Sequence, residues 1–321
     1  MVKPTVISTF AGCGGSSLGY QMAGFKELLA IEWDDNAVET FKLNFPDVPV
    51  YHGDIAKLTG KECMELAGIK KGTLDVLDGS PPCQGFSTAG KRKFNDPRNS
   101  LFMEFARLLE ELQPKVFVME NVTGMIKGVM KQAYLTIIKT LRECRYQAKG
   151  QVMNAMYYNV PQSRERVIII GVREDLGIEP SHPKPHTKPI AANKVIKDAV
   201  VDDCGNPKGI LMKRMKQVKP GSNLGKIDKK GSYFNYVRYP IGKPCMTIQK
   251  SVSFGGISIW HPTEERNLSI GEIKRIASFP DNYQMIGDYK TKIARIGNSV
   301  PPNLMKAIAE HIKTNILEVI L

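Results

Sequence analysis

One cysteine stands out as a candidate nucleophile because the chain approaches it stiffly. Cys83 follows Pro81 and Pro82, and it comes shortly after the apolar run 74–77, which predicts a short buried strand. Proline fixes φ and restricts the residue before it, so the backbone would aim the thiol. A lone cysteine more often behaves as a small buried hydrophobe, so taken by itself Cys83 fits a structural loop residue better than a nucleophile.

An acid with possible partners lies further along the chain. Glu120 ends the apolar run 116–119, and it would share the ligand-binding edge of a parallel sheet with the end of the strand before Cys83. Arg164 and Arg166 alternate, so they share one face of an extended chain. The alternative for Glu120 is an acid that caps the following turn. The alternative for the two arginines is a surface ion-pair ladder with Glu165.

A glycine turn near the N-terminus predicts a ligand site of another kind. The β-rich run 5–10 breaks into AGCGGSSLG at 11–19, and Glu32 lies twenty residues after Gly12. A turn that opens a helix brings backbone close to a ligand, and an acid at this spacing accepts hydrogen bonds from a ribose. Ser17 replaces a glycine of the dinucleotide fingerprint, which favours a nucleoside without a pyrophosphate. A tight turn without a ligand is the alternative.

Three further stretches belong to this site. Trp33 could stack on a base, and Asp54 could accept a hydrogen bond from an exocyclic amine such as that of adenine. Capping of a helix N-terminus explains Asp54 equally well. The polar stretch 88–99 has no apolar periodicity, which predicts a mobile loop over the site.

The elements that must position these residues indicate an α/β fold. Strand and helix patterns alternate as far as Glu174, which predicts a doubly wound, mostly parallel sheet. A proline-rich linker and a turn-rich, aromatic region follow, and they predict a smaller, irregular β-rich domain. After Pro302, apolar residues at four-residue steps predict a helix that returns to the first domain. We therefore expect domains of 1–178 plus 295–321 and of 179–294.

Composition narrows the class of partner. The 321 residues are 42% hydrophobic with a net charge of +13, and the region 184–250 alone holds fifteen Lys or Arg against four Asp, a net +11. A local surplus of this size is typical of a phosphate-backbone partner, although a solubilising surface is the plain alternative. The absence of a long apolar run, of a signal pattern and of CxxC pairs favours a reducing, cytoplasmic setting without a membrane or a metal.

These motifs resemble those of the DNA cytosine-5 methyltransferases, which use S-adenosylmethionine, and they occur along the chain in the same order as in that family. The likeness runs from Phe10 to Pro302 and rests on FAGCGG at 10–15, PPCQGFS at 81–87, ENV at 120–122, QSRER at 162–166, LSIGEIKRIASFPDNY at 268–283 and IGNSVPP at 296–302. Ser8-Thr9, where an acid–hydrophobe pair is common, and Gly271, where Arg is frequent, depart from the family pattern.

The resemblance implies a role for each motif. Cys83 would add to carbon 6 of a flipped-out cytosine in double-stranded DNA, and carbon 5 would then accept the methyl group. Glu120 would protonate or hydrogen-bond the ring. Arg164 and Arg166 would hold the carbonyl oxygen of the base and orient Glu120, and Asn121 would position the loop or the base. The implied S-adenosylmethionine contacts are Phe10, Ala11, Gly12, Gly14, Gly15, Leu18, Glu32, Trp33, Asp54, Ile55, Ser80, Pro81, Asn298, Ser299 and Val300; the implied DNA contacts are Gln84, Ser87, Arg92, Arg98, Gln162 and Thr247.

Two alternatives to this function stay open at the level of sequence. A tRNA cytosine-5 methyltransferase of the same family would keep every motif, and a sequence-specific DNA-binding protein could have lost its activity. The long basic domain favours DNA, and the intact Cys83, Glu120, Arg164 and Arg166 favour activity. A monomeric enzyme of a restriction-modification system, associated with the nucleoid and working beside a cognate endonuclease, fits this interpretation.

Overall fold

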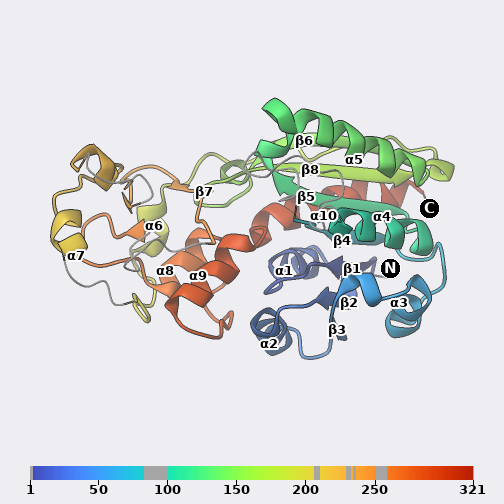
Figure 1. Ribbon diagram of the computed structural model, residues 1–321, viewed down its shortest axis with the longest axis horizontal. Coiled ribbons are helices and arrows are strands. Elements are labelled where there is room, and N and C mark those ends of the chain that lie inside the picture. The colour runs from blue at the N-terminus through green and yellow to red at the C-terminus, as the bar shows by residue number, and fades with distance from the viewer. Residues whose placement is uncertain are drawn as a thin grey trace. The chain divides into compact units, whose positions relative to one another are not determined.

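The structure is a computed structural model that describes residues 3–82, 100–205, 210–228, 233, 236–250 and 259–320. It divides into two compact units (Figure 1). The unit that we call the sheet unit contains Met1–Met153, Glu165–Lys184 and Met305–Leu321, and the small unit contains Asn154–Arg164 and Pro185–Leu304.

A seven-stranded sheet forms the centre of the sheet unit, in the order β3-β2-β1-β4-β5-β8-β6. Strands β1 to β5 pair in parallel, whereas β8 runs antiparallel to β5. This arrangement confirms the predicted doubly wound, mostly parallel sheet (Figure 1). The strands are β1 (Thr5–Thr9), β2 (Lys26–Glu32), β3 (Val50–His52), β4 (Val76–Gly79), β5 (Val116–Val122), β6 (Tyr146–Asn154) and β8 (Glu165–Arg173).

Helices cover the sheet because its strands are apolar on both faces. The largest apolar cluster joins Ile7, Leu29 and Leu77 of the sheet to side chains of α3, α4 and α5. Helix α1 lies on the other face, where Ser17 contacts Ser8. The helices of this unit are α1 (Gly15–Met22), α2 (Asp35–Asn44), α3 (Gly60–Ala67), α4 (Ser100–Leu112), α5 (Lys131–Glu143) and most of α10 (Pro302–Asn315).

The small unit is irregular, as predicted, but its described residues are less β-rich than the sequence suggests. Its described strands are two residues long: β7 (Gln162–Ser163), β9 (Val237–Arg238), β10 (Cys245–Met246) and β11 (Ile259–Trp260). Helices contribute more of its described residues: α6 (Ala192–Ile196), α7 (Ile210–Met215), α8 (Ile270–Ile276) and α9 (Tyr289–Asn298).

A capping box stabilises the start of α8. Ser269 accepts from the backbone N–H of Glu272, whose carboxylate in turn accepts from the N–H of Ser269. Gly271 follows, and a side chain there would collide with the carbonyl of Val200. That close approach explains why this position departs from the family pattern. Among the described residues, no helix is both long and apolar enough to cross a membrane.

Candidate active site

The carboxyl ends of four parallel strands, β1, β2, β4 and β5, meet at one edge of the sheet, where ligands bind in open α/β folds. This edge carries the glycine turn after β1, Glu32 at the end of β2, Ser80 and Pro81 after β4, and Glu120 in β5. The predicted residues Cys83, Gln84, Ser87, Arg92 and Arg98 lie outside the described residues.

The glycine turn has an unusual backbone. Phe10 adopts φ 54°, and Gly12 and Gly14 adopt φ 56° and 88°. The left-handed region costs a bulky residue roughly 1–2 kcal/mol, so the strain at Phe10 is stored at the predicted ligand site. Gly14 N–H donates to the carbonyl of Ala11 at 3.0 Å, which closes the turn and directs α1 away from the sheet edge. Gly15 and Leu18 are buried in α1.

Glu32 fixes the glycine turn to the end of β2. Its Oε2 accepts from Gly12 N–H at 2.8 Å, and its Oε1 accepts from the N–H groups of Trp33 and Asp34 at 2.9 and 3.0 Å. Each carboxylate oxygen has two acceptor sites, so Oε2 retains capacity for a ligand hydroxyl. The indole of Trp33 is 76% exposed beside it, a large apolar surface with room to stack on a base.

Asp54 follows β3 and starts a short helical turn, η1 (Ile55–Lys57). Its Oδ1 accepts from Ala56 N–H at 3.0 Å, so the capping role that the sequence left open is the one seen. Capping uses one oxygen, and the other is compatible with the predicted contact to an amine. Ile55 is buried in the main apolar cluster beneath.

The end of β4 is tied to the end of β5. Asn121 is buried; its Nδ2 donates to the carbonyl of Pro81 at 2.9 Å, and its Oδ1 accepts from the N–H of Val122 at 2.9 Å. Both ends of the amide are therefore used, and the side chain fixes the proline pair that leads to Cys83. Gly79 is required just before, because a Cβ there would collide with Thr9 and Phe105.

Glu120 is paired with Arg166 across the antiparallel strands β5 and β8. Arg166 Nε lies 2.7 Å from Glu120 Oε1, and the two side chains are only 11–12% exposed. The strand register explains the pair, because Val122 and not Glu120 is directly opposite Arg166, so the two side chains meet diagonally. A carboxyl group held this way has a fixed direction, as an acid that donates to a ligand atom requires.

Arg164 belongs to the small unit, although Arg166 does not. Its guanidinium is buried and donates to the main-chain carbonyls of Ile248, Gly297 and Ser299 at 2.8–3.0 Å. The sequence predicted that both arginines lie on one face of an extended chain. In the structure the chain passes from the small unit to the sheet unit between them, so they belong to different units.

Gln162 and Thr247 lie on neighbouring segments of the small unit. Strand β7 pairs with β10, Gln162 Oε1 accepts from Ile248 N–H at 3.1 Å, and Thr247 Oγ1 donates to the carbonyl of Ser163 at 3.0 Å. The resemblance placed both residues near DNA, but the sequence gave no signal that their segments pair, because the pairing spans more than eighty residues.

The predicted cofactor residues at the end of α9 also lie in the small unit. Asn298 ends α9, Ser299 Oγ donates to the carbonyl of Arg295 at 2.8 Å, and Val300 is buried. Gly297 is required beside them, since a side chain there would collide with the backbone of Gln249.

Two acids that the sequence analysis passed over lie under the glycine turn. Asp78 and Ser8 are neighbours in β4 and β1, and the hydroxyl of Tyr20 in α1 lies 3.3 Å from Asp78 Oδ1. Glu27 joins them because the register between β1 and β2 shifts after Val6, which turns its side chain toward Ser8. An acid within an apolar strand pattern was the available signal in both cases.

The fold and this edge define a class first: an α/β enzyme of the doubly wound type, with its ligand site at the carboxyl ends of the central strands. The sequence then gives the family. Residues 4–314 match the family model described as C-5 cytosine-specific DNA methylase, so the chain belongs to that family and is a DNA (cytosine-5) methyltransferase.

Known relatives support this family, and a solved structure supports the fold. The chain is 34% identical to the Type II methyltransferase M1.HphI of Haemophilus parahaemolyticus, covering 95% of this chain and 86% of the relative. It is 34% identical to M.Sau96I of Staphylococcus aureus, covering 95% and 74%. An E. coli prophage protein described as a DNA modification methyltransferase has a similar fold, with a TM-score of 0.80 at 24% identity over 98% of this chain and 100% of that one.

Proposed function

We propose that this enzyme transfers a methyl group from S-adenosylmethionine to carbon 5 of a flipped-out cytosine in a specific sequence of double-stranded DNA, through a covalent bond between Cys83 and carbon 6. The observation that carries the proposal is the single sheet edge, where the Glu32-bound glycine turn, the Asn121-fixed proline pair before Cys83 and the Glu120–Arg166 pair converge. The family and its Type II members support the same chemistry.

The residues at this edge fit the proposed cofactor. A Cβ at Gly12 would point into open space, Glu32 can accept from a ribose hydroxyl, and Trp33 offers an exposed aromatic face. When bound, S-adenosylmethionine supplies an electrophilic methyl group on a sulfonium. We propose that Asp54 and Ile55 contact the adenine, that Phe10, Ala11, Gly14, Gly15 and Leu18 surround the rest, and that Ser80, Pro81, Asn298, Ser299 and Val300 complete the site.

The reaction begins with addition to the base. The Cys83 thiolate forms a bond to carbon 6, the electrons of the C5–C6 double bond move toward the ring nitrogen and carbonyl, and Glu120 holds a proton at that nitrogen. Carbon 5 becomes enamine-like and would take the methyl group that S-adenosylmethionine supplies, while the electrons of the sulfur–methyl bond stay with sulfur and S-adenosylhomocysteine leaves. Loss of the carbon 5 proton to a base then lets the thiolate leave and restores the double bond. Arg166 fixes Glu120 for these steps.

The small unit is our candidate for target recognition. The basic stretch 184–250 suits a phosphate backbone, and the paired segments that carry Gln162 and Thr247 lie beside buried Arg164. The boundaries 179–294 stay a prediction, and so do the DNA contacts of Gln84, Ser87, Arg92 and Arg98. We further propose a monomer that acts on DNA in the cytoplasm, at the nucleoid, beside a cognate restriction endonuclease, as expected of a Type II modification enzyme.

Substitution of the nucleophile is the decisive test. Cys83→Ala should abolish methyl transfer to duplex DNA while DNA affinity stays within roughly tenfold, and a duplex with 5-fluorocytosine should form a covalent adduct with the wild type only. Cys204→Ala is the matched control, since Cys204 is a partly exposed thiol far in sequence from the motif, and it should retain activity.

Two outcomes would contradict the proposal. Normal turnover by Cys83→Ala would remove Cys83 as the nucleophile, and methylation of tRNA in preference to duplex DNA would reassign the substrate. Bisulfite sequencing of DNA treated with the pure enzyme identifies the target sequence in the same experiment.

A further inference from the structure

Helix α4 presents one arginine whose guanidinium is fully occupied. Arg107 Nε donates to Glu104 at 2.7 Å and Nη1 donates to both carboxylate oxygens of Glu111 at 3.1 Å. Nη2 donates to the main-chain carbonyls of Ile55 and Leu58 at 3.1 and 2.9 Å. The planar fork of an arginine can make such a set of bonds at once, whereas the point charge of a lysine cannot.

Helix α4 also binds the main chain at the start of α3. Glu111, which Arg107 orients, accepts from the N–H of Gly60 at the start of α3. A side chain at Gly60 would collide with Glu111, so the glycine permits this close approach. The stretch 55–60 is therefore bound to α4 at three main-chain groups.

This gripped stretch begins at the proposed adenine contact. The side chain of Asp54 is exposed and caps η1. The first residue of η1 is Ile55, whose carbonyl is one of the two that accept from Arg107. A three-residue helical turn has little stability of its own. Its orientation, and with it the direction of the Asp54 carboxylate, therefore depends on the bonds from α4.

We propose that Arg107 is a positioning residue for the adenine end of the cofactor site, acting through the backbone of residues 55–58. The proposal rests on the proposed function, in which Asp54 and Ile55 contact adenine. In this proposal Arg107 contacts neither DNA nor S-adenosylmethionine. Its loss should therefore weaken cofactor binding and leave the chemical step intact.

The chain contains a closely matched control. Like Arg107, Arg173 bonds two main-chain carbonyls, those of Gly72 and Gln113, and it bonds one carboxylate, that of Asp175, where Arg107 bonds two. It follows Val172, which pairs with the first residue of β5, so it lies at the edge of the sheet opposite the proposed site. Loss of Arg173 should therefore cost similar stability without any effect on the cofactor.

The test compares Arg107→Lys with Arg173→Lys in the full-length enzyme. Arg107→Lys should raise the Kd for S-adenosylhomocysteine, measured by calorimetry, and the KM for S-adenosylmethionine by about tenfold, because about two hydrogen bonds are lost. Its kcat at saturating cofactor should stay within about twofold. Arg173→Lys should change Tm by a similar amount and leave Kd and KM unchanged.

A double-mutant cycle tests the route through Asp54. In an Asp54→Ala background, Arg107→Lys should raise Kd by less than about threefold, because the contact that Arg107 positions is already gone. An unchanged Kd in Arg107→Lys, equal effects in the Arg173 control, or a fall in kcat with constant KM would overturn the inference. Failure of the wild type to bind S-adenosylmethionine would instead refute the proposed function, so the two failures are distinguishable.

Discussion

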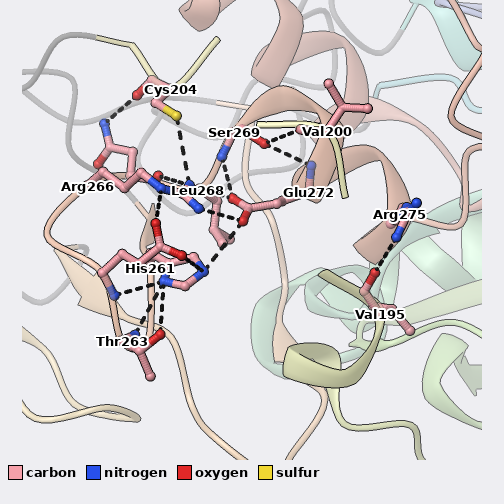
Figure 2. A network of polar contacts seen from close by, with 12 residues as sticks. Val195, Val200, Cys204, His261, Thr263, Arg266, Leu268, Ser269, Glu272 and Arg275 are labelled. Carbon is pink, nitrogen blue, oxygen red and sulfur yellow. Dashed lines mark hydrogen bonds and ion pairs between the residues drawn. The ribbon is translucent and has the colours of Figure 1, made fainter. Parts of the chain in front are cut away.

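Each unit contains buried carboxylates, but their surroundings have opposite effects on the charge. Those of Glu272 in the small unit favour the ionised form, whereas those of Glu27 and Asp78 in the sheet unit favour the protonated form. In the small unit Glu272 is 1% exposed, and both of its oxygens accept from the guanidinium of Arg266 at 2.8 Å (Figure 2). His261 Nε2 lies 3.4 Å from Glu272, and the N–H of Ser269 completes the set. Burial raises the pKa of Glu272, but these hydrogen bonds outweigh it and lower the pKa to about 2.

In the sheet unit no cation accompanies the buried acids Glu27 and Asp78 among the groups that set their pKa values. Burial raises the pKa of Glu27 to about 8, partly opposed by the hydroxyls of Ser8 and Ser17, while the charge of Asp78 adds to the rise. Neither Glu27 oxygen reaches good hydrogen-bonding geometry with a described residue. Burial likewise raises the pKa of Asp78 to about 7, partly opposed by Ser16 and Tyr20, while the charge of Glu120 adds to the rise.

The comparison shows that burial sets only the cost of a charge, and that the partners decide whether the charge remains. A guanidinium with two parallel bonds keeps Glu272 ionised, whereas hydroxyls alone leave Glu27 and Asp78 to hold a proton near neutral pH. Helix α1, which directly follows the glycine turn of the proposed cofactor site, thus contacts acids whose charge changes near neutral pH.

Removal of the guanidinium should have the largest effect. Arg266→Met leaves Glu272 buried without a counter-charge, which should reduce the free energy of unfolding by about 3–5 kcal/mol. Denaturant unfolding followed by fluorescence measures it: the chain has two tryptophans, and a Trp33→Phe background leaves buried Trp260 to report on the small unit.

A second arginine on the same region is the control. Arg275 pairs with Asp281 at 2.7 Å, but the two side chains are 26% and 49% exposed. Arg275→Met should cost no more than about 1 kcal/mol. Equal losses from the two arginines would mean that the burial of Glu272 does not matter.

Glu27→Gln tests the other side of the comparison through pH. The folded pKa of about 8 exceeds the ordinary value of 4.5, so the folded state binds the extra proton between these values. The contribution of Glu27 to stability is therefore complete below about pH 4.5 and is lost as pH rises through 8. Between pH 5 and pH 8.5 the wild type should lose roughly 2–4 kcal/mol more stability than Glu27→Gln. Parallel pH profiles for the two proteins would show that Glu27 does not titrate in this range.

Tyr20→Phe should have the smallest effect and should sharpen the picture of Asp78. Its hydroxyl bonds Asp78 at 3.3 Å, and a hydrogen bond to an ionised group is worth more than one to a neutral group. The loss of stability should therefore be about 0.5 kcal/mol near pH 5.5, where Asp78 is protonated, and about 1–1.5 kcal/mol near pH 8.5. A constant loss at both pH values would mean that Asp78 keeps one charge state.

The sheet unit was readable from the sequence because its signals are local. Asp34 directly precedes α2 and caps it, Pro302 opens α10, and the end of each predicted strand lies within a few residues of its observed position. The small unit was harder to predict, because its two-residue strands leave no alternation to detect, and its order comes from distant contacts such as Gln162 with Ile248.

The site divides in the same way. Residue types and spacing predicted which side chains gather at the sheet edge, including Glu32, Glu120 and Asn121. Sequence could not show that Arg166 pairs with Glu120 while Arg164 bonds carbonyls in the small unit, because that depends on where the chain leaves one unit for the other. The register shift that turns Glu27 inward was equally invisible, since it depends on how β2 pairs with β1.

The division of the chain also has a consequence for its synthesis. Residues 305–321 belong to the sheet unit, and Met305, Ile308, Ile312 and Ile316 of that segment are fully buried. A ribosome makes the first 184 residues, which include 154–164 of the small unit, then the rest of the small unit, and only afterwards the segment 305–321, at roughly 5–20 residues per second. For some seconds the nascent sheet therefore lacks one of its covering helices, and the sheet unit is complete only after the small unit has been synthesised.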